Sequence, residues 1–185
     1  MDKRVDMQDS NVVISVREGG YTAARELLRQ FTEVSRTHYF NVLAAKVDDP
    51  RALLETLTEL STTVPGIPTV LARVVPLTIT FNFDSPEHFE TQAREAVLQW
   101  ASQLAGKSFH VRVHRRGFKQ ELPSPKEEQM LAVTLLEAMD KAGVPGKILF
   151  DDPDAIIAVE TIDNRAGLSL WDRADLSRCP LLGLD

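Results

Sequence analysis

The chain has 185 residues, 43% of them hydrophobic, and a formal net charge of -6 at pH 7. This composition can bury the core of one large domain or two small ones, and the one cysteine, Cys179, excludes an intramolecular disulfide and a cysteine-rich zinc site. The negative charge argues against a protein that coats nucleic acid without specificity, because a polyanion needs a positive field at the contact surface.

The first half of the sequence alternates apolar β-branched runs with amphipathic stretches. Apolar residues in segment 21–31 recur at three- and four-residue spacing, which predicts a helix. Asp49 and Pro50 supply the N-cap and first-turn proline that begin another helix. Pro76 interrupts the extended segment that follows, and proline is tolerated in a sheet only at an edge or a bulge. We expect strands at 11–16, 39–47 and 70–83 and helices at 21–31 and 49–60, an order that fits a ferredoxin-like unit.

The second half begins with a helix. Ser85, Pro86 and Glu87 have the N-cap, first-turn proline and first-turn acid of a helix start. Ser124 and Glu127 have the spacing of a capping box. We expect helices at 85–104 and 124–143 and strands at 109–113, 148–150, 154–162 and 167–171. The fold class is therefore α+β, with one domain at 10–83 and a second at 84–185.

A basic stretch lies near the middle of the second half. Phe109, Val111 and Val113 alternate with His110, Arg112 and His114, so the strand has one apolar face and one face of nitrogen-bearing side chains. Between Lys107 and Lys126 the chain has six basic residues and one acidic residue. This asymmetry is typical of a localised phosphate-binding face, although a solvated surface with no partner has the same composition.

Two motifs of the second half resemble the THUMP family of RNA-binding domains. The first is FHVRVHRRG at 109–117, and the second is LFDDPD at 149–154 followed by AVE at 158–160. A helix from Ser124 separates them, as in the family, but it lacks the glycine that the family often has near Met130. The segment LARVVP at 71–76 is similar to the end of the ferredoxin-like domain in the adaptor that presents tRNA to a cytidine acetyltransferase.

The resemblance implies a tRNA-binding adaptor that holds the acceptor stem and 3′ end for a modifying enzyme, such as a cytidine acetyltransferase. Arginine makes paired hydrogen bonds to phosphate, and it also stacks on unpaired bases. Phe118 is a further candidate for stacking, with core packing as the favoured alternative. The expected RNA-binding residues are Lys107, Arg112, His114, Arg115, Arg116, Lys119 and Lys126.

Other function classes have weaker support in the sequence. No nucleophile, base and orienting group occur together, so we expect no catalytic residues and a chain that is not an enzyme. We expect no metal and no cofactor, because the histidines have no further ligand at suitable spacing and no phosphate-binding glycine loop is present. A subunit that binds protein and has little RNA affinity stays open, favoured slightly by the net charge.

The N-terminus is polar and charged, and the sequence has no run of about 18 apolar residues. We therefore expect neither a signal peptide nor a membrane span. The single cysteine is compatible with a reducing compartment, and the expected location is the cytoplasm.

Overall fold

The computed structural model describes residues 6–184 of the chain. Within this range the chain forms two compact units, and each is described by itself. The first comprises the residues up to Thr78 together with the C-terminal segment Ser177–Gly183, and the second comprises Ile79–Leu176. The domain boundary expected near 83–85 therefore lies at Thr78. The sequence assigned residues 84–185 wholly to the second domain, but Ser177–Gly183 belongs to the first unit.

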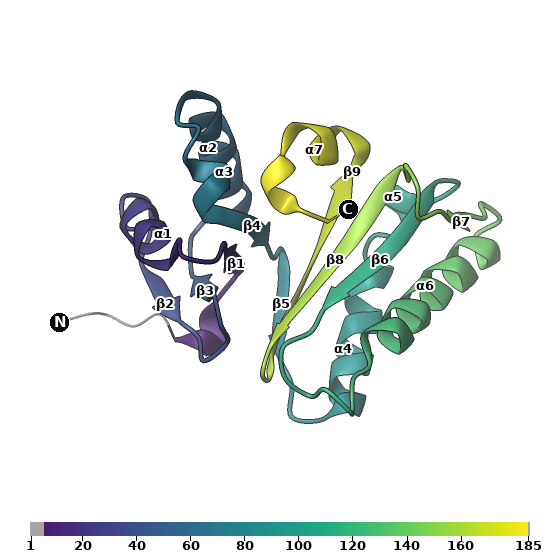
Figure 1. Ribbon diagram of the computed structural model, residues 1–185. Coiled ribbons are helices and arrows are strands. Elements are labelled where there is room, and N and C mark those ends of the chain that lie inside the picture. The colour runs from purple at the N-terminus through teal and green to yellow at the C-terminus, as the bar shows by residue number, and fades with distance from the viewer. Residues whose placement is uncertain (1–5, 185) are drawn as a thin grey trace. The chain divides into compact units, whose positions relative to one another are not determined.

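The first unit is an antiparallel sheet with strand order β2-β3-β1-β4. Strand β1 is one of the two inner strands, and its apolar residues from Val12 to Ile14 are buried. Helices and strands follow in the β-α-β-β-α-β order of ferredoxin-like domains (Figure 1). The elements are η1 (Met7–Asp9), β1 (Val12–Val16), α1 (Tyr21–Leu28), β2 (Val34–Arg36), β3 (Val42–Ala45), α2 (Pro50–Thr63), α3 (Ile67–Val70), β4 (Leu71–Pro76) and η2 (Pro180–Leu182).

Strand β2 is absent from the sequence expectation. It has only three residues and one neighbour, β3, so its extended state depends on pairing such as Val34 opposite Ala45. The strand expected at 39–47 is also shorter. Asn41 adopts a positive φ of 55°, and the chain turns there before β3 begins at Val42.

The extended segment 70–83 becomes two strands in two different sheets. Its first residue, Val70, ends helix α3. Pro76 is the last residue of β4, where a residue without an N–H group interrupts no further ladder. The N–H of Leu77 donates to the carbonyl of Asn11, and β5 then starts at Ile79 in the sheet of the second unit.

The second unit is a mixed sheet with strand order β5-β9-β8-β6-β7. Strand β6 is parallel to both β7 and β8, whereas β9 is antiparallel to β8 and to β5. Helices α4 and α6 pack on each other and cover one face of the sheet (Figure 1). The elements are β5 (Ile79–Asn82), α4 (Pro86–Leu98), α5 (Ala101–Leu104), β6 (Ser108–His114), α6 (Ser124–Lys141), β7 (Lys147–Ile148), β8 (Ala155–Ile162), β9 (Arg165–Asp172) and α7 (Arg173–Arg178).

The starts of the two long helices differ from each other. Ser85 caps α4 as expected, with its side chain accepting from the N–H of His88 at 3.1 Å. The capping box expected at Ser124 does not form, because Pro123 is the N-cap and Glu127 turns inward. Burial raises the pKa of Glu127, and the neighbouring Glu90 raises it further. The helix expected at 85–104 is also interrupted, since α4 ends at Leu98 and α5 starts at Ala101.

No helix between residues 6 and 184 is long and apolar enough to cross a bilayer.

The start of β6 is joined to the start of β8 through Ser108 and Asp154. The Oδ2 atom of Asp154 accepts from the Ser108 N–H at 2.8 Å and from its hydroxyl at 2.9 Å. The Asp154 N–H donates in return to the Ser108 Oγ at 3.0 Å. The bonds from Ser108 hold the pKa of Asp154 below its ordinary value, because they favour the charged carboxylate.

This pKa shift gives a prediction about acid stability. A lowered folded-state pKa contributes stability above the unfolded-state pKa, near about 3.9, and the contribution is lost as the pH falls through the folded-state value. We expect Asp154→Asn to lower the free energy of unfolding at neutral pH and to weaken its dependence on pH in the acid range. Urea unfolding at neutral pH and near pH 3 measures both effects. The control is Asp151→Asn, since the exposed Asp151 side chain makes no hydrogen bond within residues 6–184. If the free energy of unfolding of Asp154→Asn depends on pH in the acid range as strongly as that of the wild type, the stabilising role of the Asp154 carboxylate is contradicted.

Candidate nucleic-acid interface

Strand β6 has the two faces that its sequence predicts. Phe109, Val111 and Val113 lie in the core beneath α4 and α6. Arg112 and His114 lie on the opposite face and are half-buried. In the register with β8, Arg112 is opposite Ala158 and His114 is opposite Glu160. The predicted alternation is confirmed, and the face away from the helices carries the polar side chains.

A buried carboxylate lies at the end of this face. Glu160 is fully buried, and its Oε2 is 2.6 Å from Nη1 of Arg116. Its Oε1 is 3.5 Å from Nδ1 of His114. The backbone of Arg116 is also fixed, because its N–H donates to the Thr161 hydroxyl at 3.0 Å. The expectation that Arg116 simply reaches phosphate is corrected, since its guanidinium compensates a charge inside the protein.

The chain reverses directly after Arg116. Gly117 has a φ of 95° and Phe118 a φ of 50°, and one nitrogen of Arg115 donates to the Gly117 carbonyl at 3.0 Å. The Nε atom of Arg115 is buried and has no hydrogen-bond partner in the described part of the chain. Phe118 packs against Phe83 at 5.2 Å between ring centroids, so it belongs to the core and is no stacking surface. Arg115 is half-buried and only partly available to a ligand.

The seven predicted residues do not form one patch. Lys126 lies in the first turn of α6, on the helix layer that covers the other face of the sheet, and its Nζ is 2.9 Å from Oε1 of Glu90. This hydrogen bond raises the pKa of Lys126 and ties the ammonium to α4. Lys107 directly precedes the first residue of β6, whereas Lys119 comes after its last residue. The six residue-to-residue steps from Ser108 to His114 span about 20 Å, so the two lysines lie at opposite ends of the strand.

Three of the predicted cations remain available. The side chains of Lys107, Arg112 and Lys119 make no hydrogen bond or ion pair with the residues between 6 and 184, and both lysines are exposed. Sequence reasoning missed the internal role of Glu160, although the residue is part of the AVE motif. It also missed Lys147 and Phe150, which are exposed next to β6 and belong to no recognisable basic motif.

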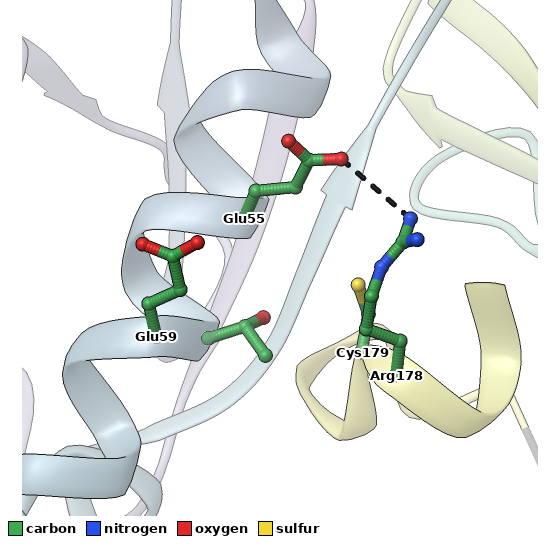
Figure 2. Close-up of a pocket in the computed structure, with 5 residues that line it drawn as sticks. Glu55, Glu59, Arg178 and Cys179 are labelled. Carbon is green, nitrogen blue, oxygen red and sulfur yellow. Dashed lines mark ion pairs between the residues drawn. The ribbon is translucent and has the colours of Figure 1, made fainter.

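A cavity of about 250 Å³ in the first unit has a different character. Figure 2 shows Glu55 and Glu59 on one side and Arg178 and Cys179 on the other, with Arg178 3.6 Å from Glu55. Two carboxylates disfavour phosphate at this place, and the Cys179 thiol is buried. No group of three or more histidine, cysteine, aspartate and glutamate residues suited to a metal ion occurs among the described residues.

No family model matches the sequence, and no curated protein matches it significantly. Solved structures do match. PH1313 from Pyrococcus horikoshii Ot3 has a TM-score of 0.58 at 12% identity, over 88% of this chain and 55% of that one. TrmN from Thermus thermophilus has 0.57 at 17% identity, over 86% and 44%. A 4-thiouridine synthetase, solved with RNA and bound ATP, has 0.53 at 13% identity, over 88% and 42%.

These similarities concern the fold. The neighbours have THUMP-type folds, so the α+β class and the THUMP-like architecture expected from the motifs are confirmed. This chain spans about half the length of each neighbouring protein. The narrower likeness to the acetyltransferase adaptor has no counterpart among them.

One expectation from the sequence is wrong as stated. The chain was expected not to be an enzyme, but the structures that share its fold belong mostly to enzymes. Besides the 4-thiouridine synthetase, they include a predicted N6-adenine-specific DNA methylase from Listeria monocytogenes and a possible methylase from Clostridium difficile. Each of these two has a TM-score of 0.52, at 12% and 13% identity, over 87% of this chain and 40% of that one. The lack of a recognisable catalytic motif therefore does not separate this chain from enzymes.

The Arg116–Glu160 pair gives a prediction about stability. Removing one partner of a buried ion pair leaves an uncompensated charge, which costs about 3–5 kcal/mol. We expect Arg116→Ala to lower the free energy of unfolding by about this amount, measured by denaturant titration. The control Lys119→Ala removes an exposed charge from the same loop and should change stability by less than about 0.5 kcal/mol. A loss below about 1 kcal/mol in Arg116→Ala would show that Glu160 does not depend on this arginine.

Proposed function

We propose that the second unit binds RNA and that the chain takes part in RNA modification. The observation that carries the proposal is the fold shared with a 4-thiouridine synthetase that was solved in complex with RNA. The motif FHVRVHRRG supports it, because the motif places the half-buried Arg112 and His114 on the sheet face away from α4 and α6. The proposal concerns how RNA is held and assigns no catalytic step.

The proposed contact surface consists of Arg112 and His114 on β6 together with Arg115, Arg116 and Lys119 after it. Arg112 and Lys119 have no internal partner in the described range and are the primary phosphate ligands. The ion pair with the buried Glu160 fixes the position of the Arg116 guanidinium. A guanidinium held in place loses less conformational freedom on binding than a mobile one.

In its finer form, the proposal is that the RNA is a tRNA held by its acceptor stem and 3′ single-stranded end. The tRNA is then presented to a catalytic unit, for example a cytidine acetyltransferase. The motifs at 71–76, 109–117 and 149–160 support this form through their family resemblance alone. We propose that this role is cytoplasmic, because the one cysteine of the chain is compatible with a reducing compartment.

A second candidate function is a protein-interaction subunit with little RNA affinity of its own. The specific observation in its favour is that two of the predicted cations, Arg116 and Lys126, are paired with glutamates of this chain. The net charge of -6 also lowers the attraction of a polyanion at long range.

The RNA-binding proposal predicts the effect of a double substitution. Replacing Arg112 and Lys119 with alanine removes two phosphate contacts worth on the order of 1 kcal/mol each. We expect the affinity for total tRNA to fall about tenfold or more, with a smaller dependence of the Kd on salt, measured by filter binding at several salt concentrations.

The matched control is Arg29→Ala combined with Lys46→Ala, which removes the same charge from exposed positions of the first unit. We expect this variant to keep nearly the affinity of the wild type. An equal loss in both variants indicates a nonspecific charge effect. A wild type that captures one protein from lysate and binds no tRNA favours the second candidate function.

A further inference from the structure

Phe150 is an exposed aromatic residue in an otherwise well-packed unit. Its side chain is 74% exposed, although the core of this unit accommodates Phe83, Phe89 and Phe109. The residue lies between β7 and β8, within the LFDDPD motif. Exposing a large aromatic side chain forgoes hydrophobic stabilisation, so its place on the surface suggests a ligand.

The ring of Phe150 rests on a fixed support. It packs against the ring of His110 at 5.4 Å between centroids with an interplanar angle of 36°. His110 is 3% exposed, and its Nδ1 is 3.0 Å from the carbonyl oxygen of Leu149. The N–H of Leu149 donates to the Phe109 carbonyl at 3.0 Å. The N–H and the carbonyl of Leu149 are thus both bonded to residues of β6, which fixes the backbone just before Phe150. The position of the ring therefore does not depend on a ligand.

Two lysines lie at the starts of β6 and β7, before the segment that leads to Phe150. Lys147 begins β7, and its N–H donates to the Lys107 carbonyl at 3.1 Å. Both lysine side chains are exposed and make no hydrogen bond or ion pair within the described range, and the charge of Lys107 contributes to the lowered pKa of Asp154. Three residues of extended chain, about 10 Å, separate Lys147 from Phe150. Of the two acids that follow Phe150, Asp152 is paired with Arg173 at 2.9 Å, whereas the exposed Asp151 has no ion pair within residues 6–184.

An exposed aromatic ring that packs on a buried histidine, with exposed lysines about 10 Å or more along the neighbouring strands, suits single-stranded nucleic acid. A base offers a flat apolar face for stacking, and its phosphates need positive charge nearby. Bases within a duplex already stack on their neighbours, so only an unpaired nucleotide can use the ring. Stacking on an aromatic ring does not depend on which base is bound, so a site of this kind binds unpaired RNA without sequence preference.

We propose that Phe150 is a stacking platform for an unpaired base of the RNA, with Lys107 and Lys147 binding the adjoining phosphates. This site rests on the proposed RNA-binding function and extends it to the opposite end of β6 from Arg115 and Arg116. It also gives Lys107 a role in RNA binding, although this residue lies at the opposite end of β6 from those arginines.

The test compares two RNA hairpins that differ only in a short single-stranded 3′ extension. Fluorescence anisotropy gives the Kd of the full chain for each hairpin. We expect Phe150→Ala to weaken binding of the extended hairpin by about five- to hundredfold and to leave the blunt hairpin unchanged. Phe150→Trp should keep the affinity of the wild type, because indole also stacks. Circular dichroism verifies that each variant is folded.

The matched control is Phe40→Ala, which removes another exposed phenylalanine, 82% exposed, from the first unit. It should leave both affinities unchanged. Wild-type binding with no effect of Phe150→Ala overturns the platform and leaves the proposed function standing. An equal loss on both hairpins overturns stacking on an unpaired base. If the wild type binds neither hairpin, both proposals fail, and a protein captured by the wild type but not by Phe150→Ala assigns the ring to a protein partner.

Discussion

The parallel pairing of β6 with β8 is the constraint on which the second unit depends. Six consecutive residue pairs fix the register from Phe109 opposite Ala155 to His114 opposite Glu160. A slip of one residue would exchange the face of β6 toward α4 and α6 and the face away from them. The same register brings Ser108 to Asp154 at the start of the two strands and the basic end of β6 to Glu160 at their finish. Packing in the core and polar contacts at both ends therefore support one alignment.

Burial of Glu160 divides the basic residues into two classes. A carboxylate removed from water needs a positive partner, so Arg116 serves the protein's own stability before it can serve a ligand. Lys126 is drawn to Glu90 in the same way, although that pair is exposed to solvent and weaker. No ion pair within the described residues involves Arg112, Lys119, Lys107 or Lys147, so their charges are available to a ligand. An acidic chain can therefore present local cationic sites, which a net charge does not reveal.

The proposed RNA contacts lie at both ends of one strand. Arg112, His114 and Lys119 lie at or beyond the later part of β6. Lys147, on the neighbouring strand β7, and Phe150, just after that strand, lie near the beginning of β6. A rigid strand places two kinds of contact at a fixed separation, one for phosphates and one for an unpaired base. This arrangement is compatible with the proposed RNA binding, and it accounts for basic residues that do not gather in a single patch.

The sequence by itself determined the secondary structure wherever a periodic apolar pattern or a helix-start signal was strong. It also determined the α+β class, the two faces of β6 and the THUMP-like motifs. It could not place β2, the change of sheet after Pro76 or the return of Ser177–Gly183 to the first unit, because these depend on pairing between distant segments. Only the tertiary structure decided which cations are free: Glu160 lies 44 residues from Arg116 in the chain, yet a strand register joins their side chains.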